Sequence, residues 1–431
     1  MDERALQRIT LFVVALASFT TPLMLSAPNV PVPAIAHALG ADAVSVGWVS
    51  TGYLLASAMF LLPFGRLADT HGRRLIFLGG LAIVTLGSLL CAVAPTFHAL
   101  VAARLFQGVG AGMLYATAMA LLTSAYPKEK RGAVIGITTS MIYFGLTAGP
   151  LLGGWITHQF GWRMVFIMPV PLTMVSLILG FTYLKGEWKS SPDGRFDMAG
   201  SLVYALSIVA LMVGVSRLPS ALGWLGALAG SGGLVVFFYF ERRNKHPVFD
   251  VALFFSNRVF TFSCLASLLI YAATFANSFL MSLFLQKLKG MNPQDAGLIM
   301  ISQPIMQALL SPLAGRLSDR IQPRILASAG MALCALGLLL LAGAGPDASL
   351  GFIVFNLLIT GTGFALFASP NVNAIMGSVE PRLYGTAGSS VAMVRVLGQM
   401  MSMGIITLVT ALVMGRLPMD PAHFGLLAKT I

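Results

Sequence analysis

The sequence predicts an all-helical membrane protein made of two related six-helix halves, with two further helices inserted between them. Three observations support this fold class. Of the 431 residues, 57% are apolar and only 10% are charged, whereas soluble domains carry about 25% charged residues. The chain also contains thirteen long apolar runs, and one short motif occurs twice at corresponding places.

Each apolar run is long enough to be a membrane span. About twenty apolar residues cross a hydrocarbon core of roughly 30 Å as a helix, which satisfies its own backbone hydrogen bonds there. We read the first run as a retained helix, because it is too long for a signal peptide and a dozen runs follow it. The thirteen expected spans are residues 9–30, 46–63, 75–94, 100–124, 133–156, 163–184, 198–216, 221–240, 259–283, 295–313, 324–343, 350–375 and 386–414.

The distribution of basic residues predicts the orientation. The net charge of +12 would suggest nucleic acid for a soluble protein, but alternate loops, counted from the N-terminus, hold 19 of the 27 Lys and Arg residues. By the positive-inside rule these loops and the N-terminus are cytoplasmic, and no nucleic-acid partner is expected. Thirteen spans would leave the C-terminus outside. Because residues 418–421 could open another helix, we expect a fourteenth span to be missing at the C-terminus.

An internal repeat predicts the domain organisation. The segment 65–69 (GRLAD), followed by Arg74, returns as 315–319 (GRLSD), followed by Arg324. Eight runs separate the copies, two more than a duplication of six-helix units requires. We therefore expect an N-terminal half at 1–190, two inserted helices within 191–250, and a C-terminal half at 251–431 that is one helix short. Secondary transporters are typically built this way, with the binding site near the midplane between the halves.

Three motifs resemble those of a known family. Residues 65–74 (GRLADTHGRR) resemble the loop signature of the major facilitator superfamily between its second and third helices. Residues 104–112 (RLFQGVGAG) are similar to its fourth-helix motif, and 145–154 (GLTAGPLLGG) resemble its fifth-helix antiporter motif. With the inserted pair, residues 10–415 resemble the fourteen-span drug:proton antiporter branch, of the multidrug efflux type. The resemblance implies the major facilitator fold and proton-driven export of small amphipathic compounds.

The repeated loop predicts a conformational latch. Its glycines permit tight turns, and its aspartate and arginines can pair with one another or cap helix ends. A positive-inside anchor would explain the arginines but not the repeated aspartate. The resemblance implies that the latch ties the halves together on the cytoplasmic side in the outward-open state. The candidate latch residues are Gly65, Asp69, Gly72, Arg73, Arg74, Gly315 and Asp319.

Two arginines within spans are candidates for ion coupling. Arg104 lies inside the fourth run, where insertion of an arginine near the centre is unfavourable by about 2.5–3.5 kcal/mol. The resemblance implies a buried cation that takes part in proton coupling, and snorkelling to the outer interface is the alternative. We expect its acceptors to be backbone carbonyls or polar side chains such as Asn29. Arg395, with Gln399 one turn further on, is the second candidate, and snorkelling is an equal alternative because Arg395 is nearer the cytoplasmic end of its run.

The fifth run has small residues one turn apart. Such residues let helices approach closely, and a proline removes a backbone donor and can kink the helix. General helix packing is one reading, and the motif resemblance favours an antiporter hinge. The candidate hinge residues are Gly145, Gly149, Pro150, Gly153 and Gly154.

The first run departs from the branch's pattern. Met24 stands where the first-helix motif usually has an aspartate, and all fifteen acids fall in loops or at the ends of runs. A carboxylate within the membrane is the usual proton carrier. The sequence therefore leaves open the coupling ion, expected to be the proton, and the direction of coupling.

The runs expected to line the cavity offer aromatic and amide groups without acids, which suits a bulky, weakly polar small molecule. For each of these residues, helix packing is an equal alternative. The candidate cavity residues are Asn29, Tyr115, Tyr271, Phe275, Asn277, Asn356 and Asn371.

Several other classes of function are disfavoured. The sequence contains no Gly-rich phosphate-binding loop that would indicate ATP as the energy source. It also contains no cluster of His or Cys residues that would indicate a metal or another cofactor. The three cysteines lie within apolar runs, and we interpret them as buried apolar side chains. A membrane enzyme would need paired catalytic groups within spans, so no enzymatic activity is expected. An importer or exporter of one specific metabolite remains the alternative to drug export. We expect a monomer in the lipid bilayer of the cytoplasmic membrane.

Overall fold

The computed structural model describes residues 3–41, 48–184, 197–218, 220–244, 251–291, 293–343, 345 and 348–414. Every regular element in these ranges is helical. Twelve helices of the described part are long and apolar enough to cross a membrane. The thirteenth predicted run corresponds to α17, which extends over Tyr384–Met414. The predicted all-helical membrane fold is therefore confirmed, and the expected fourteenth span falls outside the described residues.

The first part of the chain supplies six spans, in which α1 continues into the short helix η1 and α7 with α8 forms the sixth. Gly72 separates α3 from α4 with a φ of 124°, a backbone conformation that favours glycine. The side chain of Thr96 caps α5 by accepting a hydrogen bond from the Ala99 amide at 3.2 Å. The elements are α1 (Glu3–Ser26), η1 (Ala27–Asn29), α2 (Val32–Leu39), α3 (Trp48–His71), α4 (Arg73–Val93), α5 (Phe97–Ala125), η3 (Lys128–Lys130), α6 (Arg131–Phe160), α7 (Met164–Ile167) and α8 (Val170–Tyr183).

The rest of the chain supplies the inserted pair and the second group of helices. Side-chain caps begin several of these helices, as where Asn257 accepts a hydrogen bond from the Phe260 amide at 3.0 Å. The elements are α9 (Met198–Ser216), α10 (Ala221–Glu241), α11 (Val251–Ser256), α12 (Arg258–Leu283), η4 (Phe284–Leu288, a π-helix), α13 (Pro293–Met300), α14 (Ser302–Ser318), α15 (Pro323–Ala342), α16 (Leu350–Gly377), η5 (Pro381–Leu383) and α17.

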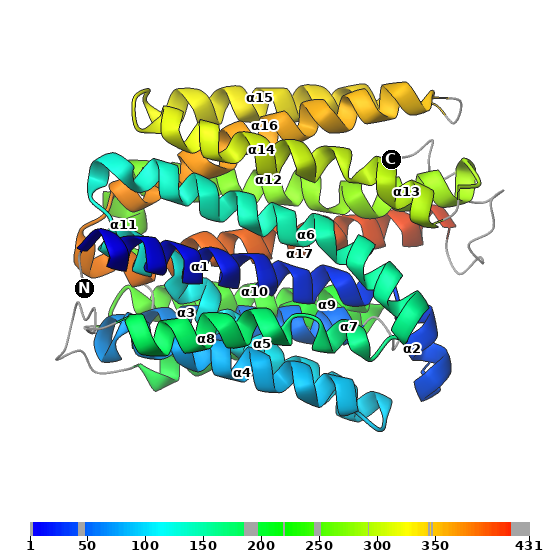
Figure 1. Ribbon diagram of the computed structural model, residues 1–431, viewed down its shortest axis with the longest axis horizontal. Helices are drawn as coiled ribbons and strands as arrows, with labels where there is room; N and C mark the ends of the chain where they lie inside the picture. The colour runs from blue at the N-terminus through cyan, green and yellow to red at the C-terminus, as the bar shows by residue number, and fades with distance from the viewer. Residues whose placement is uncertain are drawn as a thin grey trace.

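The two groups of helices lie side by side and share the same internal pairing (Figure 1). In the first group α5 packs against α3 and α4, and α1 packs against α6. In the second group α16 packs against α14 and α15, and α12 packs against α17. The groups meet where α6 contacts α14 and where α17 contacts α3 and α5. We call the end at which α3 and α14 finish and α4, α6 and α17 begin the basic end, because it carries Arg66, Arg73, Arg131 and Arg316.

The inserted helices α9 and α10 form a hairpin beside the contact of the two groups. The Tyr204 hydroxyl of α9 donates to the carbonyl of Ala58 on α3 at 2.9 Å. Tyr204 and Phe237 also belong to one buried apolar cluster with residues of α3 and with Met393 of α17. The pair therefore packs onto helices from both sides of the predicted repeat. The exact domain boundaries stay a prediction.

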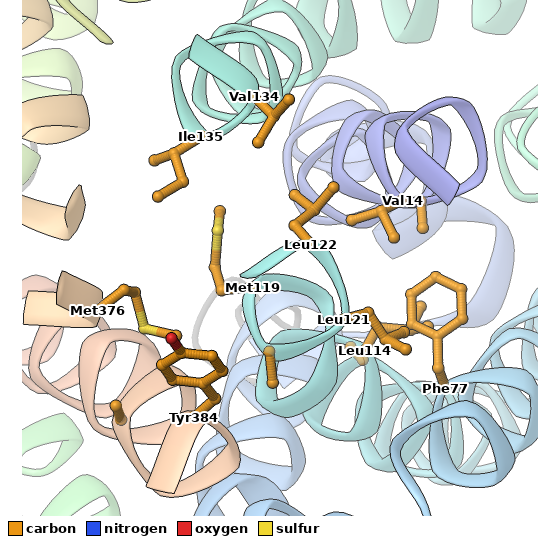
Figure 2. Packing of buried hydrophobic residues seen from close by; sticks show 14 of the residues in the cluster. Val14, Phe77, Leu114, Met119, Leu121, Leu122, Val134, Ile135, Met376 and Tyr384 are labelled. Atoms are coloured by element: carbon orange, nitrogen blue, oxygen red, sulfur yellow. The ribbon is translucent and has the colours of Figure 1, made fainter. Parts of the chain in front are cut away.

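A buried core joins the two groups near the basic end. Figure 2 shows Met119 of α5 between Ile135 of α6 and the neighbouring pair Met376 and Tyr384 from the second group. These side chains are at most 8% exposed. The three cysteines are buried and free, as expected of apolar bulk.

Candidate functional site: a latch, a buried arginine and a central cavity

The first copy of the repeated motif forms a buried ion pair at the basic end. The Asp69 carboxylate accepts from the Arg73 guanidinium at 3.1 Å and 2.8 Å. Asp69 is 1% exposed and Arg73 2%. Gly72, with its positive φ, lies in the turn between these two residues, and the two side chains meet across that turn.

Arg73 also reaches the second group of helices. Its guanidinium donates to the hydroxyl of Ser124 at 2.7 Å and to the carbonyl of Pro381, in η5, at 3.0 Å. Arg131 makes a second bridge, since it donates to the Tyr384 hydroxyl and lies 5.0 Å from the centre of that ring. The first copy of the motif is thus tied to the segment that leads into α17.

The second copy makes a different contact between the same two groups. The Asp319 carboxylate accepts from the backbone amides of Gly132 and Ala133 at 2.9 Å and 3.1 Å, at the start of α6. Burial raises the pKa of the Asp319 carboxyl, and the hydrogen bonds from α6 and from Asn373 oppose that rise. Arg324, the arginine that follows this copy of the motif, donates a hydrogen bond to the side chain of Gln322. One aspartate of the repeat therefore pairs with an arginine and the other caps a helix.

The glycine of the second copy allows α14 to touch α6 backbone to backbone. A Cβ atom on Gly315 would overlap the carbonyl oxygen of Gly132, and one on Gly136 would lie 2.6 Å from the carbonyl oxygen of Ser311. Larger residues would therefore hold the two groups apart at the basic end. Among the other latch candidates, Arg74 donates to the Phe181 carbonyl within its own group, and Gly65 is buried in α3.

Arg104 is completely buried in the interior of α5. Its guanidinium donates to the carbonyls of Val49 and Met24 at 2.6 Å and 3.1 Å. An exposure of 0% excludes snorkelling to the interface in this structure. The backbone acceptors agree with the expectation, but Asn29 is exposed and accepts from Ser50 instead. The Met24 carbonyl thus contacts the arginine at the position where the related motif has an aspartate.

A polar network surrounds Arg104. Gln107 accepts from its guanidinium and donates to the Ser88 hydroxyl at 2.6 Å, and the ring of Tyr53 lies 4.5 Å away. One guanidinium nitrogen, Nη2, has no hydrogen-bond partner among the described residues. Gln107 was not predicted as a partner of Arg104, although its spacing of three residues places it on the same helix face.

The glycines of α6 pack against α1 within the first group. A Cβ atom on Gly145 would overlap the Phe19 carbonyl oxygen, and Cβ atoms on Gly149 and Gly153 would overlap Ser26 and Ala27. Gly154 is different, because its nearest neighbour would lie at 3.6 Å. Pro150 lies inside the same helix. The first three glycines permit close helix contact, and the hinge role of the motif stays a prediction.

A cavity of about 50 Å³ lies between the two groups of helices. Both groups contribute to its wall, and Arg395 of α17 is the one charged residue among those that line it in the described part of the chain. The lining residues are Ala17, Ser18, Thr21, Leu114, Tyr115, Ala118, Met119, Thr139, Ile142, Tyr143, Tyr271, Ala368, Val372, Gly388, Val391, Ala392 and Arg395.

Tyrosines from both groups meet at this cavity. The hydroxyls of Tyr143 on α6 and Tyr271 on α12 lie 3.3 Å apart, and both rings make edge contacts with Phe364. The Arg395 guanidinium lies 4.8 Å from the ring centre of Tyr115. Tyr115 and Tyr271 were predicted to line the cavity. Tyr143 was not among the predicted cavity residues, and its bulky neighbours Met141, Ile142 and Phe144 give no signal of the face that lines the cavity.

The other cavity candidates lie outside this lining. Asn356 is buried and donates to the Gly337 carbonyl at 2.7 Å, which joins α16 to α15. Asn371 donates to the Ser267 hydroxyl at 2.8 Å and so joins α16 to α12. Phe275 and Asn277 follow Tyr271 along α12 and do not contribute to the wall. Buried amides between helices are satisfied by neighbouring polar groups, and both α16 asparagines act in this way here.

Two curated relatives match most of the chain. RibZ of Clostridioides difficile (strain 630), named a riboflavin transporter, is 30% identical over 390 residues, covering 90% of this chain and 84% of that protein. Stp of Mycobacterium tuberculosis (strain CDC 1551 / Oshkosh), named a multidrug resistance protein, is 31% identical over 412 residues, covering 94% of this chain and 76% of that protein.

Solved structures share the fold at low identity. The human organic anion transporter MFSD10 gives a TM-score of 0.70 at 16% identity, with 100% of this chain and 99% of that chain covered. The proton:xylose symporter XylE gives 0.71 at 14% identity, with 100% and 94% covered. The family model described as Major Facilitator Superfamily matches residues 14–403. The chain is a multi-pass membrane transporter that belongs to the Major Facilitator Superfamily.

Proposed function

We propose that this transporter exports small amphipathic organic compounds across the cytoplasmic membrane by alternating access, in exchange for protons. The observation that carries the proposal is the tyrosine-lined cavity between the two groups of helices. Its volume of about 50 Å³ is well below the roughly 300–1,000 Å³ of sites for drug-sized ligands. Substrate binding therefore needs the groups to move apart, as alternating access requires.

In this proposal the basic end faces the cytoplasm. The excess of Lys and Arg in the loops of that end supports the assignment, and the N-terminus then lies on the same side. The Asp69 and Arg73 pair and the Asp319 cap act as the latch that closes this end. Their contacts with η5 and α6 are lost when the two groups separate there, so each favours one conformation over the other.

Export and proton exchange share one line of support, and each has a second of its own. The resemblance of 145–154 to the antiporter motif and relatives named multidrug resistance proteins favour export of drug-like compounds. For proton exchange the support is the same motif together with the buried Arg104, whose acceptors come from α1 and α3. We also propose that a monomer suffices for transport, because described residues of one chain line the cavity from both groups of helices.

Transport of one specific metabolite is the second candidate. It is favoured by the relative RibZ, which is named a riboflavin transporter and matches 90% of this chain. A multidrug exporter should act on several chemically unrelated dyes, whereas a metabolite transporter should act on one compound and its analogues.

Energised membrane vesicles test the proposal. Inverted vesicles with and without the protein are given a panel of fluorescent dyes and riboflavin, and uptake into the vesicle lumen is followed. Nigericin collapses the pH gradient and should stop the uptake if protons are exchanged. Valinomycin with potassium collapses the electrical potential and separates its contribution from that of the pH gradient. Uptake of no compound above that of empty vesicles would refute export, and uptake that resists nigericin would refute proton exchange alone.

A further inference from the structure

Arg395 places a positive charge at the wall of the central cavity. It lies eleven residues after the start of α17, about 16 Å along the helix axis, which is near the middle of a roughly 30 Å hydrocarbon core. The side chain is partly exposed to the cavity and lies over the ring of Tyr115. A snorkelling role does not fit this position, since the side chain cannot reach either interface from the middle of the membrane.

No negative charge of the described chain balances Arg395. Within the described residues its guanidinium makes no hydrogen bond or ion pair, and the cavity wall contains no acid. The helices that face it contribute hydroxyls, rings and apolar groups, as with Ser18 and Thr21 of α1 and Thr139 of α6. Arg104 adds a second interior arginine, with backbone carbonyls and Gln107 in place of a carboxylate. The interior of the transporter is therefore positively charged.

The surroundings of Arg395 also limit the shape of what it can bind. Tyr115, Tyr143 and Tyr271 line the same cavity, and the hydroxyls of Tyr143 and Tyr271 lie 3.3 Å apart. Aromatic rings take up flat, conjugated bodies by stacking or edge contacts, and a planar guanidinium binds an oxyanion through two parallel hydrogen bonds. Charge and shape together select a flat molecule with an oxyanion at one end.

We propose that the substrates are organic anions with a planar aromatic body, and that Arg395 binds their carboxylate, sulfonate or phosphate group. This inference rests on the proposed function, because it names the substrate class of the same cavity. A cation in the cavity would meet an uncompensated like charge in a medium of low dielectric constant, and a cationic drug is the substrate that this site disfavours most.

The test uses the full chain in proteoliposomes with two dyes that share a three-ring xanthene body. Fluorescein is anionic at neutral pH, and rhodamine 6G is cationic. Transport of each is measured for the parent, Arg395→Gln, Arg395→Lys and the control Arg217→Gln, which removes an exposed arginine far from the cavity. We expect the parent to move fluorescein in preference to rhodamine 6G.

The expected effects follow from the loss of one buried charge pair, formed by Arg395 and the oxyanion of the substrate. Arg395→Gln should slow fluorescein transport by about 30-fold or more. Arg395→Lys should recover part of that rate, since it keeps the charge and loses the planar fork. Arg217→Gln should match the parent. Fluorescein transport by Arg395→Gln at the parent rate would overturn the assignment.

The dye preference of the parent tests the anionic substrate class even if the Arg395→Gln variant fails to fold. Transport of rhodamine 6G without fluorescein would overturn the anionic substrate class and leave export itself standing. Transport of neither dye, nor of any compound in the vesicle panel, would remove the proposed function and this inference with it.

Discussion

The substitution Asp69→Asn tests the latch most directly. It removes the carboxylate that Arg73 contacts at 2.8 Å while keeping the size of the side chain. Removing one partner of a buried ion pair destabilises a structure by about 3–5 kcal/mol, because the other charge stays buried without compensation. This penalty applies while the basic end is closed, since Arg73 becomes hydrated once the groups separate there.

The expected shift between conformations is large. Taking the lower value of about 3 kcal/mol, the ratio of closed to open basic ends should fall by roughly 100-fold. Spin labels at Lys130→Cys and Arg320→Cys, two exposed positions on either side of the α6 and α14 contact, report the separation in a variant without the native cysteines. Double electron-electron resonance should show a longer distance as the dominant population in the Asp69→Asn variant.

The control is Asp295→Asn, which removes an exposed carboxylate on α13, remote from the latch. It should leave the distance distribution of the parent unchanged. An Asp69→Asn protein with the parent distribution and the parent rate of transport would refute the latch, because the buried ion pair would then stabilise both conformations equally.

Three further predictions concern the helix cap at Asp319, the glycines of α6 and the buried Arg104. Asp319→Ala removes the cap of α6, a loss of about 0.5–2 kcal/mol, so the same spin labels should report up to about a 30-fold gain of the open form. No change in the distances would argue against the cap. Gly149→Ala should lower Tm and transport through overlap with Ser26, an effect of about 1–3 kcal/mol, whereas Gly154→Ala should have little effect. Equal Tm values for the two variants would contradict this. Arg104→Ala should insert and bind substrate but fail to export, and Arg104→Lys should recover little, because three acceptors need the planar fork. Export by Arg104→Ala at the parent rate under the same gradient would disprove coupling.

Features that depend on length and local spacing were predictable from the sequence. The thirteen runs correspond to helices because a span needs a fixed number of apolar residues. The pairing of Asp69 with Arg73 was foreseeable, since only four residues and one glycine turn separate them. The close packing of Gly145, Gly149 and Gly153 follows from their spacing of one turn on one helix face.

Features that depend on the rotation of a helix, or on two distant segments, were not predictable. Asp319 caps α6 by accepting from the amide of Gly132, which lies 187 residues earlier in the chain, and no local signal records that contact. Asn356 and Asn371 occupy helix faces that turn toward neighbouring helices, whereas Tyr143 faces the cavity. In a membrane helix the apolar background is nearly uniform on all sides, so periodicity does not identify the face that lines a cavity.

The proposed anionic substrate gives a physical reason for the absence of a carboxylate at position 24. Moving one charge through a membrane potential of 100 mV changes its free energy by about 2.3 kcal/mol, which corresponds to roughly a 50-fold concentration ratio. An inside-negative potential drives an anion outward by that amount with no proton carrier at all, and exchange for protons would add to it. A cationic drug, by contrast, moves outward against the potential and needs a coupled ion. Met24 and Arg395 are therefore consistent with the proposed anionic substrate, because the membrane potential can drive export of an anion without a carboxylate that carries protons.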